Sequence, residues 1–361
     1  MTSASGKPVM AILAGGTGGH IFPALAVGRQ LQQQGAELVW LGTRRGLEAD
    51  IVPKQQIPLL FIEIEGVRGR GVIALLKAPF LLLKAILSAR KLMRANGVTA
   101  ALGMGGFVAG PGGVAAKTLG IPLVIHEQNA IAGTTNKLLA KIANRRFVAF
   151  PNALPNSEWC GNPVRADVAA VAEPEQRLAG RSGAAKLLVL GGSRGALAIN
   201  KVVPLALAQL ADGKRPEVWH QSGQAHHETT VQAYAEADVS ARVEPFIDDM
   251  AAAYAWADFV VCRAGALTVA ELAAVGLAAI LIPFPYAIDD HQTVNGQWLV
   301  DNGSAVLMQE RDMTIERLAS AIASLTNEPA RRLAMAQAGR KLARTDADQT
   351  VAGALLEVAN G

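Results

Sequence analysis

A histidine closes the first glycine-rich turn of the chain, where its chemistry is suited to moving a proton. The turn runs from Gly15 to His20 and follows the apolar stretch from Val9 to Ala14. An imidazole in a loop keeps a pKa near neutrality and can take the proton of an attacking hydroxyl. The alternative is that His20 only caps the following helix. We favour a functional role, because residues that bind or react are concentrated on loops held by rigid elements.

Three glycine-containing turns follow apolar runs, and each is suited to binding an anion. They lie at residues 15–20, 191–196 and 263–271. Where such a turn opens a helix, backbone N–H groups and the positive end of the helix dipole point towards a phosphate. The first turn does not match G-x-G-x-x-G, because Ile21 takes the third glycine position, and neither of the first two contains G-x-x-x-x-G-K-[ST]. The turns therefore predict phosphate-bearing ligands other than NAD, and not a P-loop nucleoside triphosphatase.

The second turn also fits the chemistry of a serine hydrolase. Residues 191–195 match G-x-S-x-G, with Ser193 as the nucleophile. Asp248 or Asp249 and then His291 follow in the order Ser, Asp, His. A hydrolase would leave the equivalent turn of the first half without a role. We therefore interpret Ser193 as a phosphate-binding hydroxyl and keep the hydrolase as an alternative.

The third turn leaves two roles open for Glu271. Thr268 and Glu271 have the S/T-x-x-E spacing of a capping box, so Glu271 either caps its own helix or faces a ligand. The polar run that follows another apolar stretch, from His126 to Asn129, adds hydrogen-bonding side chains at a strand end. The adjacent histidines His226 and His227 lie in a polar stretch and are predicted to be solvated.

No metal site is expected. The D-x-D triplet from Asp346 to Asp348 lies in the C-terminal tail, whereas a metal-dependent sugar transferase needs such a triplet beside a strand end. Cys160 and Cys262 are about a hundred positions apart and have no ligand spacing, which also argues against a disulfide framework. A reducing, cytoplasmic compartment fits this use of cysteine.

The elements that must position these residues alternate as strand, turn and helix in both halves of the chain. This order is typical of doubly wound α/β domains with parallel sheets, which bind ligands at the carboxyl ends of their strands. We expect a helix over 23–34, a second after residue 196, and a hinge at 161–163. The predicted strands are residues 9–14, 38–41, 100–102, 123–126, 146–149, 186–190, 217–220, 242–244, 259–262 and 279–283.

Length and composition agree with two folded domains. The 361 residues are 51% hydrophobic and 18% charged, which excludes a mainly disordered chain. The apolar stretch after the N-terminus is too short for a secretion signal. The long uncharged window at 95–117 contains MGGFVAGPGG, which is predicted to prevent a continuous helix. We therefore expect no membrane-spanning helix.

Charge is distributed unevenly along the chain. Residues 1–163 contain 17 Lys and Arg against 7 Asp and Glu, a net charge of +10, whereas the remainder has 17 against 23, a net charge of −6. Between residues 66 and 126 there is no Asp or Glu. The basic residues of this interval are Arg68, Arg70, Lys77, Lys84, Arg90, Lys91, Arg94 and Lys117.

The segment 72–93 combines this positive charge with an apolar sequence, VIALLKAPFLLLKAILSARKLM. Pro79 predicts a break into two short helices. Part of the segment must complete the core of the first domain, and its basic residues favour docking on an anionic bilayer. Nucleic acid is the competing polyanion, but the basic region has only Phe80 and Phe107 as aromatic residues and no stacking platform. We expect a membrane surface and no nucleic acid.

Eight motifs together resemble one known family. They are GGTGGH at 15–20, MGGFVAGPGG at 104–113, HEQNAIAGTTN at 126–136, GNPVR at 161–165, GGSRGA at 191–196, FIDDMAAAYAWAD at 246–258, CRAGALTVAE at 262–271 and DDHQTVNG at 289–296. From about residue 10 to residue 300 the chain resembles the MurG family. These bacterial enzymes transfer N-acetylglucosamine (GlcNAc) from UDP-GlcNAc to undecaprenyl-pyrophosphoryl-MurNAc-pentapeptide (lipid I), which forms lipid II for peptidoglycan.

The resemblance implies a GT-B fold, with two Rossmann-like domains facing each other across a cleft. It implies an acceptor-binding and membrane-associating domain at 1–163, a UDP-GlcNAc-binding domain at 164–340, and a helix at 341–361 that returns to the first domain. The donor site that it implies consists of Thr17, Gly18, Gly19, Asn129, Arg165, Ser193, Ile247, Ala266, Leu267, Thr268, Val269, Ala270, Glu271 and Gln292. Arg194 departs from the glutamine expected there.

The implied reaction is an inverting transfer to the C4 hydroxyl of MurNAc, without metal or cofactor, with His20 or Glu127 as the general base. The implied place is the cytoplasmic face of the inner membrane, as a peripheral protein beside other cell-wall synthesis proteins, with roles in cell shape and division. A UDP-GlcNAc epimerase of the same fold and a noncatalytic UDP-sugar sensor remain as alternatives.

Overall fold

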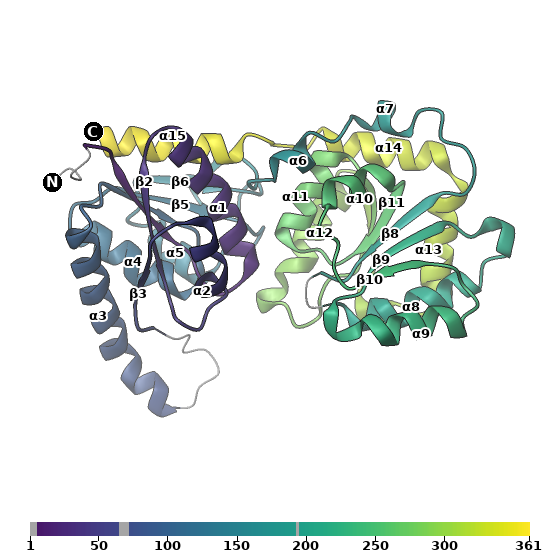
Figure 1. The fold of residues 1–361 in the computed structure, drawn as a ribbon, viewed down its shortest axis with the longest axis horizontal. Coiled ribbons are helices and arrows are strands. Elements are labelled where there is room, and N and C mark those ends of the chain that lie inside the picture. The colour runs from purple at the N-terminus through teal and green to yellow at the C-terminus, as the bar shows by residue number, and fades with distance from the viewer. Residues whose placement is uncertain (1–5, 65–71, 193–194) are drawn as a thin grey trace. The chain divides into compact units, whose positions relative to one another are not determined.

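The chain forms two compact units in a computed structural model that describes residues 6–64, 72–192 and 195–361, with residues 72–77 described through their backbone alone. Unit 1 comprises residues 1–163 and 344–361, and unit 2 comprises residues 164–343. Each unit has a central parallel sheet covered by helices, as the alternation of strands and helices predicts (Figure 1). Each is described separately below.

The sheet of unit 1 has seven parallel strands in the order β3-β2-β1-β4-β5-β6-β7. Their bounds are β1 (Val9–Leu13), β2 (Glu37–Gly42), β3 (Leu59–Phe61), β4 (Ala100–Gly103), β5 (Leu123–Glu127), β6 (Arg145–Val148) and β7 (Glu158–Trp159). The strand order reverses between β1 and β4, where Leu13 pairs with Gly103. In doubly wound sheets this reversal is the place where ligands bind. The turns after β1, β4 and β5 therefore meet at one edge.

Helices cover both faces of this sheet (Figure 1). They are α1 (Gly18–Gln33), α2 (Glu48–Ile51), α3 (Val72–Ala95), α4 (Gly106–Thr118), α5 (Thr134–Leu139) and α15 (Ala347–Asn360), with a 3-10 turn at Pro53–Gln55. Because successive side chains of a strand point to opposite faces, β1 contributes to two cores. Met10 and Ile12 pack with α1 and α15, whereas Ala11 and Leu13 pack with α3 and α4.

The last helix of the chain, α15, belongs to the core of unit 1. Val351 and Leu355 are fully buried in the same cluster as Met10 and Ile12. At the surface of this packing, the side-chain amide of Gln30 on α1 donates to Asp348 at 2.9 Å. The chain therefore leaves unit 1 after residue 163 and returns to it at residue 344.

Unit 2 repeats the architecture with six parallel strands in the order β10-β9-β8-β11-β12-β13. The strands are β8 (Lys186–Leu190), β9 (Glu217–Gln221), β10 (Arg242–Glu244), β11 (Phe259–Cys262), β12 (Ala278–Leu281) and β13 (Ala305–Leu307). The strand order reverses between β8 and β11, where Leu190 pairs with Cys262. This reversal places the turns after β8 and β11 next to each other.

The helices of unit 2 also lie on both faces of its sheet (Figure 1). They are α6 (Ala166–Ala169), α7 (Pro174–Leu178), α8 (Leu197–Ala208), α9 (His227–Glu236), α10 (Met250–Trp256), α11 (Ala266–Val275), α12 (His291–Asp301), α13 (Ile315–Asn327) and α14 (Pro329–Arg340). Short 3-10 turns occur at Asp212–Lys214, Gln224–His226, Ile288–Asp290 and Glu310–Asp312. Leu187 and Val189 of β8 pack against Val203 of α8 and Ile322 of α13, which buries one face.

The predicted break at Pro79 is wrong, because α3 continues through it as one helix from Val72 to Ala95. A proline removes one backbone hydrogen bond, and the neighbouring Ala, Leu and Lys residues are strong helix formers. Ala89 and Met93 in the second half of the helix are fully buried, which anchors it on the sheet. The predicted helix at 23–34 likewise begins earlier, at Gly18, and contains Pro23.

The expectation that MGGFVAGPGG prevents a continuous helix is also wrong, since α4 runs from Gly106 to Thr118. Close packing explains why glycine is used here. A Cβ on Gly112 would lie 3.0 Å from Leu13, and one on Gly113 would lie 2.6 Å from Leu139. Burial against β1 and α5 therefore outweighs the low helix propensity of glycine. In the described part of the chain, no helix has both the length and the apolar run needed to cross a bilayer.

Candidate active site

The glycine turn after β1 places His20 at the carboxyl edge of the sheet of unit 1. Thr17 is the cap residue of α1, so His20 lies in the first helical turn and does not cap it. The turn after β4 packs against the imidazole: a Cβ on Gly105 would lie 3.1 Å from Cε1 of His20, and a Cβ on Gly106 would lie 3.5 Å from Cδ2. Both glycines have positive φ, 95° and 75°, which a side chain would strain. His20 Nδ1 lies 2.7 Å from Oε1 of Gln128.

Glu127, the second candidate base, is held by donors of its own loop. Glu127 is buried, with 2% of its surface exposed. Oε1 accepts from the backbone N–H of Asn129 at 2.9 Å, and Oε2 accepts from the N–H of Gly133 at 3.1 Å and from Asn136 Nδ2 at 2.9 Å. Both carboxylate oxygens are thus used to hold the loop after β5. His20 is the better placed of the two candidates for proton transfer.

We expect Glu127→Gln to lower the free energy of unfolding by about 2–3 kcal/mol, because an amide nitrogen would face donors that now meet a carboxylate. Urea denaturation of the whole chain measures this. Glu357→Gln is the matched control, since Glu357 makes an exposed ion pair with Arg145 whose loss costs about 0–1 kcal/mol. A loss for Glu127→Gln no larger than that of the control would contradict the loop-holding role.

Glu48 is a residue of this site that the sequence analysis missed. It is fully buried, and it accepts hydrogen bonds from Gly16 N at 3.0 Å and from Thr43 N at 2.9 Å. A Cβ on Gly46 would lie 2.1 Å from its carboxylate, so glycine is required there. Glu48 therefore holds the first glycine turn through its hydrogen bond with the backbone N–H of Gly16. The available signal is an acidic residue two positions after Gly46, in a segment that follows a strand.

Unit 2 contains a cavity of about 820 Å³ at the carboxyl edge of its sheet. Its lining comes from the turns after β8 and β11, from α8, and from the segments before and within α12. The lining residues are Gly191, Gly192, Gly195, Ala196, Leu197, Ala198, Lys201, His226, Arg263, Gly265, Thr268, Phe284, Gln292 and Glu310. The second and third glycine turns thus meet in one cavity, and the predicted donor residues Thr268 and Gln292 line it. Ser193 and Arg194 lie outside the described residues.

The cavity has the electrostatics of an anion site. Lys201 and Arg263 line it, and the helices α8 and α11 begin at it. Arg263 donates to the carbonyls of Ile282 at 3.2 Å and Pro283 at 3.1 Å and pairs with Glu310, which fixes its guanidinium. Lys201 and two helix N-termini favour a diphosphate here, whereas the carboxylate of Glu310 offsets part of the charge of Arg263.

His226, which was predicted to be solvated, is half-buried and lines the cavity. A Cβ on Gly195 would lie 2.8 Å from its ring. His226 comes shortly after β9, at the same sheet edge as the glycine turns, and that position is the signal that could have placed it in the site.

The capping role considered for Glu271 is also wrong, because α11 begins at Ala266 and Gly265 is its cap residue. Glu271 instead accepts a hydrogen bond from the hydroxyl of Tyr254 at 2.9 Å and pairs with Arg165, whose Nε lies 3.4 Å from Oε1. Burial raises the pKa of Glu271 above the ordinary 4.5, and Arg165 and Tyr254 partly oppose that rise. A carboxylate held by two partners in the second turn of α11 is suited to accept from ligand hydroxyls.

We expect the affinity for UDP-GlcNAc to fall as the pH drops through the raised pKa of Glu271, because the protonated carboxyl loses an acceptor site. Folding stability has the opposite sign. A raised carboxyl pKa means that the stability contributed by this group falls as the pH rises through the folded-state pKa. Calorimetric titration of UDP-GlcNAc across acidic pH measures the first effect. An affinity that did not change in that range would contradict it.

The other predicted donor residues are distributed over both units. Ile247 is 2% exposed, and its backbone N–H donates to Gln221 Oε1 at 3.0 Å. Val269 is fully buried, so its side chain belongs to the core, whereas its neighbours in the first turns of α11 are partly exposed. Thr17, Gly18, Gly19 and Asn129 lie in unit 1.

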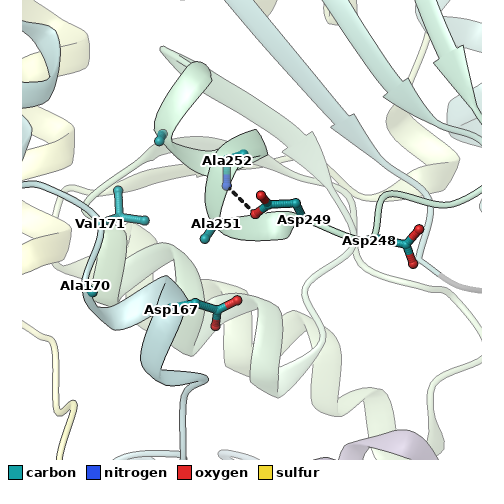
Figure 2. A pocket seen from close by; sticks show the side chains of 8 residues that line it. Asp167, Ala170, Val171, Asp248, Asp249, Ala251 and Ala252 are labelled. Carbon is teal, nitrogen blue, oxygen red and sulfur yellow. Dashed lines mark hydrogen bonds between the residues drawn. The ribbon is translucent and has the colours of Figure 1, made fainter.

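A second, shallower pocket of about 660 Å³ lies beside α10 (Figure 2). Its polar side chains are Asp167, Asp248 and Asp249, and Asp249 Oδ1 accepts from Ala252 N at 2.8 Å to cap α10. Three carboxylates repel a diphosphate, so this pocket is less suited to an anion than the cavity between the glycine turns. Among the described residues, no group of three or more His, Cys, Asp or Glu side chains has a metal-binding arrangement.

Comparison with protein families gives two matches that together cover most of the chain. Residues 10–148 match the glycosyltransferase family 28 N-terminal domain, and residues 186–351 match the glycosyltransferase family 28 C-terminal domain. The two matches lie in unit 1 and, apart from the last residues, in unit 2.

Curated relatives are similar over nearly the whole chain. The UDP-N-acetylglucosamine--N-acetylmuramyl-(pentapeptide) pyrophosphoryl-undecaprenol N-acetylglucosamine transferases of Nitrosococcus oceani and Cellvibrio japonicus are 54% and 52% identical, each over 97% of this chain and 98% of the relative. The crystal structure of Acinetobacter baumannii MurG superposes with a TM-score of 0.87 at 44% identity, over 97% of this chain and 99% of that one. The calicheamicin glycosyltransferase CalG4 has a TM-score of 0.66 at 13% identity, over 98% of this chain and 97% of that one, which is a likeness of fold.

Proposed function

We propose that the chain transfers GlcNAc from UDP-GlcNAc to lipid I and so forms lipid II. It belongs to glycosyltransferase family 28 and, within that family, to the UDP-N-acetylglucosamine--N-acetylmuramyl-(pentapeptide) pyrophosphoryl-undecaprenol N-acetylglucosamine transferases. The resemblance inferred from the eight motifs is confirmed, and so is the GT-B fold. The observation that carries the reaction is the cavity of unit 2, in which two glycine turns, two helix starts, Lys201 and Arg263 meet. It has the size and charge that a nucleotide diphosphate requires.

In the proposed reaction, the C4 hydroxyl of MurNAc attacks the anomeric carbon of GlcNAc from the face opposite the leaving group, which inverts that carbon. His20 takes the hydroxyl proton as the new C–O bond forms. The bond from the anomeric carbon to the β-phosphate oxygen breaks, and its electron pair leaves with UDP. Lys201, Arg263 and the N-termini of α8 and α11 stabilise the charge that develops on the diphosphate.

The alternatives considered for this chain find no support in its relatives, which are named as transferases. Two of the residues considered for a Ser193 hydrolase, Asp249 and His291, also make hydrogen bonds with other groups. Asp249 caps α10, and Nδ1 of His291 lies 2.7 Å from the carbonyl oxygen of Ile288.

The deciding experiment is incubation of the purified protein with UDP-GlcNAc, with and without a short-chain lipid I analogue, in EDTA. We expect UDP release and disaccharide formation that both require the acceptor and persist without divalent metal. UDP release without acceptor would overturn the proposal in favour of an epimerase or a hydrolase. Bound UDP-GlcNAc with no turnover would overturn it in favour of a sensor.

Membrane association is the second part of the proposal, and it is supported by the exposed apolar side chains of α3. Phe80 is 75% exposed, and Leu83 and Leu87 are more than half exposed. One basic residue of this helix, Lys84, forms an exposed ion pair with Glu63 at 2.6 Å. Arg90 and Lys91 lie further along the helix. We propose that this surface places the protein as a peripheral protein on the cytoplasmic face of the inner membrane, beside other cell-wall synthesis proteins.

We expect Leu87→Ser to weaken binding to anionic phospholipid vesicles, because an exposed leucine that enters the interface contributes about 1.5–3 kcal/mol.

Replacing Lys77, Lys84, Arg90 and Lys91 together by Glu should release the protein from such vesicles, at about 1 kcal/mol for each cation near the surface. Co-sedimentation measures both. Leu205→Ser on α8 is the matched control, since Leu205 is also an exposed helical leucine. Equal effects of the Leu87 and Leu205 changes would contradict docking through α3.

A further inference from the structure

A continuous row of side-chain hydrogen bonds leads from the backbone of unit 1 to His20. It joins the carbonyl of Gly161, the imidazole of His126, the amide of Gln128 and the imidazole of His20. His126 is fully buried and Gln128 is 1% exposed, so water does not compete for these bonds. The donor and the acceptor of each hydrogen bond follow from the chemistry of the two atoms that it joins.

The first bond fixes the protonated nitrogen of His126. Its Nε2 lies 2.8 Å from the carbonyl oxygen of Gly161, which can only accept, so Nε2 carries the hydrogen. Burial lowers the pKa of His126, although the Gly161 carbonyl and Glu127 partly oppose this, and the ring is therefore neutral. A neutral ring protonated at Nε2 presents a lone pair at Nδ1.

The second step fixes the amide of Gln128. Its Nε2 lies 3.0 Å from Nδ1 of His126 and 2.9 Å from the carbonyl oxygen of His126. Both neighbours are acceptors, so the two amide hydrogens are used by them. A rotated amide would place its oxygen against a carbonyl oxygen and a lone pair. The Oε1 atom must therefore face His20.

The third step reaches the proposed base. Oε1 of Gln128 lies 2.7 Å from Nδ1 of His20 and can only accept, so Nδ1 of His20 carries the hydrogen. Neutral His20 then has its lone pair on Nε2, for which no hydrogen bond is found within the described residues. The glycines at 105 and 106 lie against the ring and keep it in this orientation.

We propose that Gln128 and His126 are positioning residues that fix the tautomer of His20, so that Nε2 is the atom that takes the proton of the attacking hydroxyl. This inference rests on the proposed function of His20 as the general base. In the Ser-His-Asp triad a carboxylate fixes the tautomer of the base, and the wrong tautomer there lowers kcat by about 10⁴-fold. Here a neutral amide, oriented by the imidazole and the backbone carbonyl of His126, has that role.

The tautomer is measured directly by long-range ¹H–¹⁵N correlation spectra of the full chain labelled with ¹⁵N-histidine, without substrate. Comparison with His20→Gln assigns the His20 signals. We expect neutral His20 to be protonated at Nδ1 and neutral His126 to be protonated at Nε2. The opposite tautomer at either residue would overturn the inference. Since this readout needs no turnover, it stands or falls separately from the reaction.

Kinetics with variants of Gln128 give the second test. We expect Gln128→Leu to shift neutral His20 towards the Nε2-protonated form and to lower kcat on the order of 10²-fold, with the KM for UDP-GlcNAc unchanged. Gln128→Glu keeps an oxygen acceptor towards His20 and should restore the Nδ1-protonated form and part of kcat, while its second oxygen, set against the carbonyl and Nδ1 of His126, should lower the stability of the loop. The control Asn144→Ala removes a side-chain acceptor from Leu123 N, at the other end of β5, and should leave kcat unchanged. Retention of both tautomer and kcat in Gln128→Leu would overturn the positioning role.

Discussion

His20→Gln is expected to lower kcat by about 10²- to 10⁴-fold, which is the usual contribution of a general base. Glutamine keeps a polar side chain of similar reach but cannot take a proton at neutral pH. The KM for UDP-GlcNAc should stay nearly constant, because the positive groups of the donor cavity lie in unit 2 and are not altered. Steady-state kinetics with a lipid I analogue measure both parameters.

Two further measurements make this result specific to proton transfer. Calorimetric titration with UDP-GlcNAc should give the same affinity for His20→Gln as for the unaltered chain. The decrease in kcat should also persist at saturating acceptor, because a loss of acceptor binding alone is recovered there. Near-normal turnover of His20→Gln at saturating substrates would contradict the assignment of His20 as the base.

Glu271→Gln should have the largest effect on donor binding. We propose that Glu271 accepts from the ribose hydroxyls of UDP-GlcNAc. Such charged hydrogen bonds are worth about 1.5–3 kcal/mol each, so we expect the KM for UDP-GlcNAc to rise about 10- to 100-fold. The amide also sets an N–H group against Arg165 or the hydroxyl of Tyr254, both of which now donate to Glu271. The pH dependence of UDP-GlcNAc binding at acidic pH should disappear in the same variant.

Two tyrosines of unit 2 supply a matched control for this experiment. Tyr254→Phe removes the hydroxyl that orients Glu271 and should raise the KM several-fold, by about 1 kcal/mol. Tyr234→Phe removes an equally buried hydroxyl, which bonds to His220 Nδ1 at 2.9 Å, and should lower stability without changing the KM. Equal KM values for the two tyrosine variants would contradict the role of Tyr254 in donor binding. A KM unchanged in Glu271→Gln would contradict the ribose contact itself.

The strands that position the site are those that the sequence predicts well. Residues 186–190 are an apolar run that ends at a glycine pair, and β8 has the same bounds. The strands β3, β7 and β13 were not predicted. Each has only two or three residues, and Phe61 of β3 is exposed, although β10, which also has three residues, was predicted at its bounds. The helix α4 was predicted wrongly for a tertiary reason. Its glycines are tolerated because Leu13 and Leu139 fill the space beside them.

The residues of the site can be predicted where the residue type alone indicates the function. His20 and the glycine turns are of this kind, since an imidazole or a run of backbone donors has the same use in many folds. Glu48 and Gln128 are not, because Glu48 acts on Gly16, 32 positions away, and Gln128 acts on His20, 108 positions away. Glu271 lies between these cases, since its spacing from Thr268 indicated a cap and only the start of α11 at Ala266 excludes it.

The return of the chain to unit 1 has a consequence for the order in which the protein matures on the ribosome. Ala347, Val351 and Leu355 are core residues of unit 1, yet they are synthesised after the whole of unit 2. Residues 164–343 are complete before α15 emerges, so unit 2 can finish folding while unit 1 still lacks one helix layer. Domains usually fold in the order of synthesis, from the N-terminus onwards. Unit 1 is therefore begun before unit 2 but completed after it. Until α15 packs on the sheet of unit 1, that sheet exposes apolar side chains that chaperones can bind.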